Sequence, residues 1–310
     1  GDFGLLIANK YDITNYKTAE LNITDENKTM IHWYPGHMTK AKRMMEENIK
    51  LIDLCIELVD ARTPLASRNP DIDELGKNKS RMILLIISDL ADIECNQKWM
   101  EFFKKKGYFV VEVNSRNGVG MKEINKTVQE ACKEKIERDR RRGILNRPVR
   151  AMVVGIPNVG KSTFINSFAG KACTKTGNKP GVTKGKQWIR LNKSLELLDT
   201  PGILWPKFED QRIGQLLAMI GSINDDILPL EELVLDLLQI LKDHYPQLLI
   251  KRYHLSDVEK QPLDILAEIA TVRKCFSKGE ELDYRKASAL IMDDFRAGRI
   301  GRITLERPEL

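Results

Sequence analysis

Residues 155–162 read Gly155-Ile156-Pro157-Asn158-Val159-Gly160-Lys161-Ser162 and match the pattern GxxxxGK[ST] in full. An apolar run at residues 151–154 precedes the motif, and a helical pattern opens at residues 163–165. A strand, a glycine-rich loop and a helix in this order are typical of a phosphate-binding loop, because backbone N–H groups and the helix N-terminus both attract anions. A glycine turn with an accidental lysine is the alternative. We therefore expect a nucleotide site here.

The motif also assigns roles within the loop. Lys161 reaches the β- and γ-phosphates, and Ser162 supplies a hydroxyl to Mg²⁺. The predicted phosphate-binding residues are Asn158, Val159, Gly160, Lys161, Ser162 and Thr163.

Two later segments extend the site. Asp199-Thr200-Pro201-Gly202 follows the apolar run 195–198, so Asp199 can hold Mg²⁺ and Gly202 can donate its N–H to the γ-phosphate. Between the motifs, Thr183 is our candidate for a mobile Mg²⁺ ligand, with Thr176 as the weaker alternative. Each segment alone could be a plain loop, but their order after the phosphate loop favours a switch.

Hydrophobic patterning predicts an α/β fold. Apolar runs that alternate with helical patterns are typical of a mostly parallel sheet with helices on both faces. The expected strands are 53–60, 82–87, 108–113, 151–154 and 195–198. The expected helices of this part are 40–52, 97–106 and one long helix, 121–142, whose charged end we interpret as a solvated face. Strand patterns stop near residue 211, and helical patterns follow at 227–245, 262–276 and 284–297.

These patterns divide the 310 residues into three parts. Residues 1–29 are expected to be an extension, a leader or a tag, because Met30 would make a natural start. Residues 30–210 should form the nucleotide-binding domain and residues 211–310 a small all-helical domain.

Composition narrows the class of protein. A formal net charge of +6 permits an anionic partner without proving one. The five cysteines form no CxxC pair, which argues against a disulfide framework or zinc site and favours the reducing cytoplasm. No apolar run approaches the roughly 20 residues that span a bilayer.

Together the motifs resemble a GTPase of unusual order. A guanine-reading NKxD loop usually follows the DxxG loop, but here the fitting loops precede residue 155. Ser88 and Asp89, after the strand 82–87, resemble the first base-contacting loop. The second, after the strand 108–113, is Asn114-Ser115-Arg116. The chain therefore resembles a circularly permuted GTPase.

Further motifs narrow this resemblance to the YlqF/YawG family of bacterial ribosome-assembly GTPases. They are Trp33-Tyr34-Pro35-Gly36-His37-Met38, Asp60-Ala61-Arg62-Thr63-Pro64 and Ile203-Leu204-Trp205-Pro206-Lys207 after the DxxG loop. The resemblance implies GTP hydrolysis with Mg²⁺, late assembly of the large (50S) ribosomal subunit, contact with its rRNA, and a monomer that binds neither membrane nor DNA. It also makes His37 a catalytic candidate and Asn158 a K⁺ ligand.

The chain departs from the family pattern at two positions. Ile86 and Ile87 stand where NKxD has Asn and Lys, although Asp89 can still accept hydrogen bonds from guanine N1 and N2. Asn9-Lys10-Tyr11-Asp12 satisfies NKxD and could substitute from the extension, but Asn-Lys pairs recur along this chain by composition alone. Guanine preference is therefore expected with weakened affinity.

The sequence leaves alternatives for the group that positions the attacking water and for the residues that contact RNA. Ile203 occupies the place where many GTPases orient water with Gln, so His37, a K⁺ ion or a partner must position the water. A lone His is otherwise an ordinary surface or core residue. Arg296, Arg299 and Arg302 are the best candidates for rRNA phosphate contact. A nucleotide-binding assembly scaffold with negligible hydrolysis and a P-loop NTPase with relaxed base choice remain alternatives.

Overall fold

The computed structural model describes most of the chain outside the loops around the phosphate-binding motif. The described residues are 4–6, 17–23, 29–33, 35–114, 118, 120–156, 164–165, 167–168, 174–176, 188–198, 202–203, 210–223 and 228–309.

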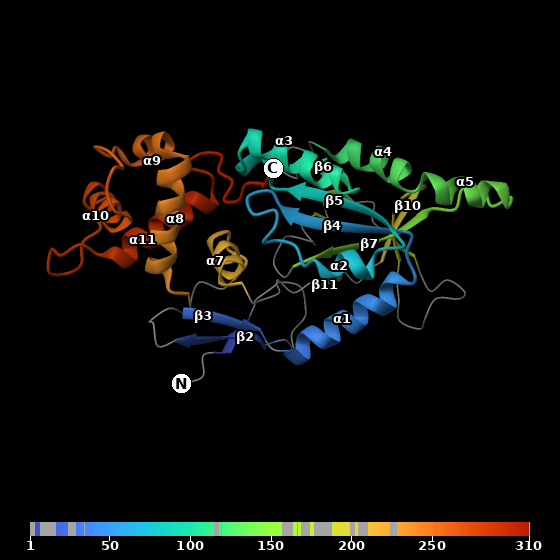
Figure 1. Cartoon of the computed structure of the whole chain (residues 1–310), viewed down its shortest axis with the longest axis horizontal. Helices are drawn as coiled ribbons and strands as arrows, with labels where there is room; N and C mark the ends of the chain where they lie inside the picture. Colours follow the sequence, from blue (N-terminus) through green and yellow to red (C-terminus); the bar gives the residue numbers. More distant parts are fainter. Residues whose placement is uncertain are drawn as a thin grey trace.

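A mostly parallel sheet forms the centre of the protein (Figure 1). Its strands, in spatial order, are β6 (Phe109–Glu112), β5 (Ser80–Ile86), β4 (Leu54–Asp60), β7 (Val149–Gly155), β10 (Leu195–Leu198), β9 (Trp188–Asn192) and β8 (Thr174–Thr176), and β11 (Gly202–Ile203) also pairs with β7. Only β9 and β8 run antiparallel to their described neighbours. The predicted α/β class is confirmed. The antiparallel pair corrects the sequence interpretation, which treated the segment between the phosphate loop and β10 as a loop because its Gly, Thr and Lys mask the short strand pattern.

Side chains on β4 alternate between two apolar layers, as the pleat of a strand requires. Cys55 packs with α1 (Pro35–Ile49) and α2 (Asp71–Leu75), and Val59 packs with α3 (Ile93–Lys105). Leu54, Ile56 and Leu58 belong to a second layer that also holds residues of α4 (Met121–Ala131). Both faces of the sheet are therefore covered, which explains why its strands read as unbroken apolar runs.

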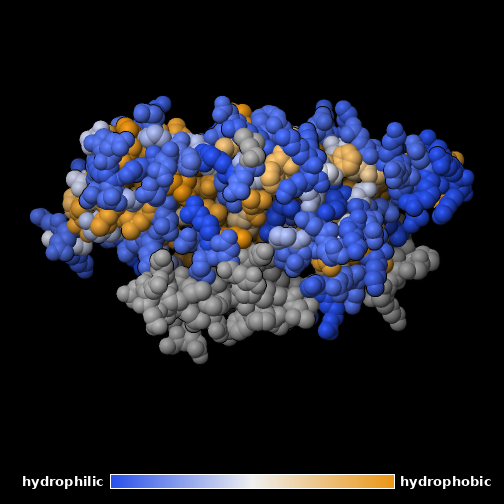
Figure 2. All heavy atoms as spheres, viewed as in Figure 1, coloured by the Kyte–Doolittle hydropathy of each residue, from blue (hydrophilic) through white to orange (hydrophobic). Residues whose placement is uncertain are grey.

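The long helix expected over 121–142 is two helices, α4 and α5 (Lys133–Arg141). The break occurs at Cys132, whose φ of −106° and ψ of 17° leave the helical region while its side chain lies in the core. The charged end is only partly a solvated face. Lys135 and Asp139 are buried and paired at 3.2 Å, whereas Arg138 and the neighbouring arginines are exposed. Hydrophilic residues dominate the end of the molecule where α5 lies (Figure 2).

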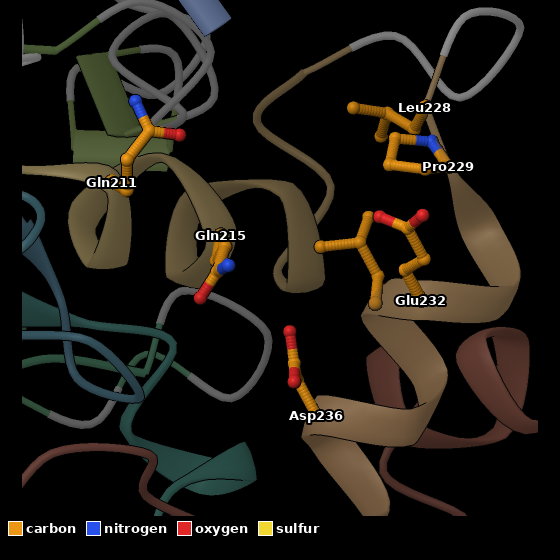
Figure 3. A pocket seen from close by; sticks show the side chains of 7 residues that line it. Gln211, Gln215, Leu228, Pro229, Glu232 and Asp236 are labelled. Atoms are coloured by element: carbon orange, nitrogen blue, oxygen red, sulfur yellow. The ribbon is translucent and has the colours of Figure 1, made fainter. Parts of the chain in front are cut away.

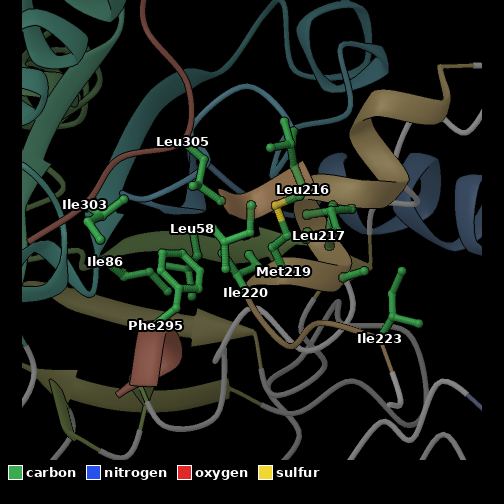
Figure 4. Close-up of a cluster of buried hydrophobic side chains, with 14 of the residues drawn as sticks. Leu58, Ile86, Leu216, Leu217, Met219, Ile220, Ile223, Phe295, Ile303 and Leu305 are labelled. Carbon is green, nitrogen blue, oxygen red and sulfur yellow. The ribbon is translucent and has the colours of Figure 1, made fainter. Parts of the chain in front are cut away.

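The C-terminal part is helical, as predicted. It contains α7 (Gln211–Met219), α8 (Leu230–His244), α9 (Pro246–Tyr253), α10 (Pro262–Val272) and α11 (Tyr284–Arg296). Its core continues into the sheet: Leu58 and Ile86 lie in one apolar cluster with Leu217 and Phe295 (Figure 4). The two parts are therefore joined by packing as well as by the chain.

The N-terminal residues include strands of a separate antiparallel sheet, β1 (Gly4–Leu6), β2 (Lys17–Ile23) and β3 (Thr29–Trp33). Ala19 of β2 lies opposite Trp33 of β3, so the backbone of the extension pairs with the start of the expected GTPase domain. Asn9-Lys10-Tyr11-Asp12 lies outside the described residues.

Two further observations concern the described residues alone. None of their helices is both long and apolar enough to cross a bilayer. Their four cysteines, Cys55, Cys95, Cys132 and Cys275, are free and buried, and burial raises the pKa of the Cys132 thiol to about 11.

Candidate nucleotide site

The phosphate-binding motif has the expected elements on both sides. Strand β7 ends at Gly155, followed by the buried Ile156, and the backbone is helical again at residues 164–165 and 167–168. Phe164 is buried and stacks on Phe168, with ring centroids 5.6 Å apart. These contacts anchor the strand before the loop and the helix after it. The residues from Asn158 to Thr163 lie outside the described part of the chain, so their phosphate contacts stay predictions.

Strand β11 brings the DxxG motif to the same place. Gly202 pairs in parallel with Val154, and Ile203 pairs with Gly155, the first residue of the phosphate-loop motif. The backbone of Gly202 therefore lies beside the strand end from which the phosphate loop departs. Asp199 and Thr183 are outside the described residues.

The two predicted base-contacting loops lie next to each other. The first follows β5 and contains a short 3₁₀ helix, Ser88–Leu90. The Ser88 N–H donates to the carbonyl of Val113, the residue before Asn114, at 3.3 Å. The Asn96 side chain of α3 donates to both the Ser88 carbonyl and the Glu112 carboxylate at 3.1 Å. Ser88, Asp89 and Asn114 are thus brought together, while Ser115 and Arg116 are outside the described residues.

Ile86 and Ile87 both pack with apolar side chains, but they differ in burial. Ile86 is 4% exposed and lies in the apolar cluster of Figure 4, and Ile87 packs against the same cluster. Ile87 has a φ of +57°, a left-handed conformation that is an outlier for a β-branched residue. The loop therefore turns after β5 with Ile86 in the core, Ile87 packed against the core, and a strained backbone at Ile87.

A buried guanidinium lies close to the base loop. Arg62 donates to both Asp60 carboxylate oxygens, at 3.0 and 2.8 Å, and its charge also interacts with Asp89. Burial lowers the pKa of Arg62, but Asp60 and, more weakly, Asp89 raise it above its usual value. The Arg62 guanidinium therefore lies within electrostatic range of Asp89 in the first base loop.

The loop that contains Arg62 is held by residues that the sequence did not single out. Arg68 donates to the buried Glu57 of β4 at 2.8 Å and to the hydroxyl of Tyr108 at 3.0 Å. Burial raises the pKa of Glu57 although Arg68 opposes the shift. A carboxylate within the apolar run of β4 was the available signal, because such a group needs a buried partner.

His37 lies in a different local structure from the one expected. The sequence predicts a helix only from residue 40, but the backbone is helical from Pro35, and His37 is the third residue of α1. Proline fits the first helical turn because its missing N–H is not needed there. Helix α1 packs against β11, so the element that carries His37 adjoins Gly202 and Ile203. The side chain of His37 is outside the described part.

The three arginines proposed for rRNA contact have protein partners. Arg296 donates to the carbonyls of Ala218 and Met219 at the end of α7. Arg299 donates to Asp294 at 3.0 Å, with half of its side chain exposed. Arg302 is exposed as a residue, yet it donates to two carbonyls of the base loop. Arg302, although it belongs to the helical part, therefore lies against the first base loop.

A cavity between α7 and α8, of about 30 Å³, is not suited to the nucleotide (Figure 3). Its lining includes Gln211 and Gln215 of α7 and the carboxylates Glu232 and Asp236 of α8. Two carboxylates repel a polyphosphate. The phosphate-loop end of β7 therefore remains the candidate site.

Comparisons with known proteins agree with this geometry. Residues 150–269 match the family described as 50S ribosome-binding GTPase. The chain is 46% identical over 280 residues to ribosome biogenesis GTPase A of Bacillus cereus, which covers 90% of this chain and 95% of that protein. It is 30% identical to mitochondrial ribosome-associated GTPase 1 of Bos taurus, over 91% and 90% of the two chains. The GNP-bound structure of YlqF from T. maritima gives a TM-score of 0.63 at 28% identity, over 87% of this chain and 99% of that one.

Proposed function

This chain belongs to the ribosome biogenesis GTPase A family, so it is a GTPase of ribosome biogenesis, and we propose that it acts late in the maturation of the large (50S) ribosomal subunit. The observation that carries the proposal is the pairing of Gly202 with Val154 at the carboxyl edge of the same parallel sheet whose strands β5 and β6 lead into the two adjacent base loops. It supports one site with phosphate, switch and base functions. The proposed setting is the cytoplasm, with rRNA as the partner surface and a monomer as the active form.

In the proposed site, the backbone N–H groups of Asn158 to Thr163 and the Lys161 ammonium bind the phosphates. Ser162, Thr183 and Asp199 would hold Mg²⁺, which neutralises charge on the phosphates when bound. Their hydroxyl and carboxylate oxygens are the donors that Mg²⁺ prefers. The pairing of β11 with β7, which brings Gly202 of the same motif to this strand end, supports the proposal. Asn158 is the proposed K⁺ ligand.

The chain's own residues divide the remaining work. Asp89 accepts two hydrogen bonds from guanine, beside Ser88 and the segment Asn114 to Arg116. His37 orients the attacking water, because the Ile203 side chain has no polar atom for that task. The Gly202 N–H holds the γ-phosphate and is released by hydrolysis, so β11 and the helices after it respond to the nucleotide.

A scaffold with negligible hydrolysis is the second candidate, and the buried Ile86 and half-buried Ile87 favour it because neither supplies a polar group to the base loop. Phosphate release separates the two. We expect slow release from GTP by the protein alone, little from ATP, and faster release with purified 50S subunits.

The variant that tests the site in this assay is Lys161→Ala. Its matched control is Lys193→Ala, because Lys193 is an exposed lysine between β9 and β10. Lys161→Ala should lose both binding and release, and Lys193→Ala should lose neither. Equal release from GTP and ATP would favour relaxed base choice. GTP binding without release, even with subunits present, would favour the scaffold.

A further inference from the structure

The chain after α11 crosses the first base loop. We name residues 298–306 the C-terminal strap. The Ile303 N–H donates to the Leu90 carbonyl at 2.9 Å, and Thr304 Oγ1 accepts from the Asp92 N–H at 3.0 Å. Gly298 lies so close to the loop that a Cβ there would stand 2.6 Å from Leu90 Cδ2. The strap is therefore fitted to the loop by backbone bonds and by close packing.

Arg302 of the strap binds the loop on both sides of Asp89. Its Nη2 donates to the Ser88 carbonyl at 2.8 Å, and its Nε donates to the Ala91 carbonyl at 2.7 Å. The guanidinium is a planar fork with fixed spacing between its donors. Two bonds from one rigid group fix the separation of Ser88 and Ala91, and hence the backbone that carries Asp89.

The first base loop has few polar side-chain bonds of its own near Ile86 and Ile87, so the hydrogen bonds from Arg302 matter for its conformation. The apolar side chain of Ile86 lies in the core and that of Ile87 packs against it, so neither anchors the loop through a polar side-chain bond. The left-handed backbone of Ile87 is strained, and such strain persists only where the surroundings impose it. Asn96 and Arg302 both donate to the Ser88 carbonyl immediately after the strained residue.

We propose that Arg302 is a positioning residue for guanine recognition: by binding the Ser88 and Ala91 carbonyls, it holds Asp89 in the orientation that accepts the N1 and N2 protons of guanine. This inference rests on the proposed function, in which Asp89 reads the base. It deepens that function by placing a determinant of base specificity in the C-terminal segment rather than in the base loop.

The test compares GDP with inosine diphosphate, which lacks the 2-amino group and so loses one of the two bonds to Asp89. The dissociation constants of both nucleotides are measured by titration calorimetry for the parent protein, Arg302→Ala and Arg302→Lys. The control is Arg285→Ala, which removes an exposed arginine from the first turn of α11. Thermal melting verifies that each variant folds.

We expect Arg302→Ala to reduce the preference for GDP over inosine diphosphate about fivefold, as for the loss of one hydrogen bond. Arg302→Lys should lose part of it, because an ammonium cannot span both carbonyls with a fixed fork. Arg285→Ala should keep the parent ratio. A residue that only stabilises the fold would weaken both nucleotides equally and leave the ratio unchanged.

Two other results would overturn the inference in distinguishable ways. If the parent protein prefers GDP and Arg302→Ala retains the full preference, Arg302 does not position Asp89 and the proposed function stands. If the parent protein itself binds the two nucleotides equally, the assignment of Asp89 as the guanine reader fails, and the role of Arg302 fails with it.

Discussion

Ile87 is the residue at which local preference and fold disagree most. A β-branched residue in the left-handed region raises the free energy of the folded state by about 1–3 kcal/mol. Isoleucine has no side-chain hydrogen bond that could offset this strain. Its neighbour Ile86 is better placed, because its side chain fills the cluster with Leu58 and Phe295. The two departures from NKxD are therefore not equivalent. Restoring Asn at position 86 would bury an amide among apolar groups, whereas position 87 is only partly buried.

The first prediction follows from that difference. Ile87→Lys should tighten GDP binding and widen the gap over ADP, because an unbranched side chain relieves strain and its stem can cover the base. Ile93→Lys is the matched control, since Ile93 is 59% exposed at the start of α3. Titration calorimetry measures the GDP and ADP affinities of both variants.

The double variant with Ile86→Asn should melt at a lower temperature than Ile87→Lys alone. Unchanged GDP affinity in a folded Ile87→Lys protein would contradict the base-loop assignment.

The second prediction concerns His37, on the helix that packs against β11. His37→Ala should slow GTP hydrolysis by about a hundredfold, as for the loss of a group that orients or deprotonates water. Binding of a non-hydrolysable GTP analogue should change much less. His244→Ala, an exposed histidine at the end of α8, is the control. Equal losses in binding and turnover would indicate a structural role for His37.

At the scale of elements, the strap depends on a glycine. Gly298 has a φ of +77° and touches Leu90, whereas Gly107 has a φ of +94° with open space around it. Alanine at either position should cost about 1 kcal/mol of unfolding free energy through the backbone. Only Gly298→Ala should also weaken GDP binding, because Leu90 belongs to the base loop and must move. Denaturant melts and GDP titrations of the two variants test this third prediction. Equal GDP affinity would show that the strap does not act on the loop.

The fourth prediction concerns pH and the end of the strap. Glu306 accepts the N–H groups of Leu65 and Ala66, and burial raises its pKa to about 7 despite these bonds and the nearby Arg212. The folded protein thus binds this proton more tightly than the unfolded chain, whose glutamate titrates near about 4.3. The stabilisation is complete below that pH and is lost as the pH rises through about 7.

Glu306→Gln should therefore gain about 2 kcal/mol of unfolding free energy relative to the parent between pH 5 and pH 8, because glutamine still accepts both N–H groups but does not ionise. Glu309→Gln, an exposed carboxylate nearby, is the control and should show no such trend. Chemical denaturation across this pH range is the measurement. A constant difference between Glu306→Gln and the parent would mean that Glu306 titrates normally.

The elements that could be predicted from sequence are those whose signal is local. The apolar runs gave β4, β5 and β7, and the order of motifs placed the base loops beside each other because parallel strands end at one edge. The partners of Arg296 and Arg302 could not be predicted. An arginine among small residues has the same sequence pattern whether its guanidinium binds an RNA phosphate or a backbone carbonyl of the protein. The break at Cys132 was equally hidden, since cysteine fits either a helix interior or a core-facing bend.

For the whole molecule, the shared core and the strap join the helical part to the nucleotide loops at several points. Tyr245, between α8 and α9, donates to Asp92, which in turn accepts the first N–H groups of α3. The hydroxyl of Tyr245 also accepts the Thr304 N–H of the strap at 3.1 Å. A partner that binds the helical part more tightly in one nucleotide state can therefore act on the base loop through these contacts.

The last prediction tests this coupling with purified 50S subunits. Co-sedimentation should be stronger with a non-hydrolysable GTP analogue than with GDP, and subunits should accelerate phosphate release, since a partner shifts the switch only through differential affinity. Arg299→Ala should weaken subunit binding and reduce its salt slope by about one if this half-exposed guanidinium meets an rRNA phosphate. GDP affinity should be unchanged in Arg299→Ala but not in Arg302→Ala, because only Arg302 touches the base loop. If subunit binding is equal with GDP and with the GTP analogue, and subunits do not accelerate phosphate release, the 50S subunit is not the partner of this GTPase.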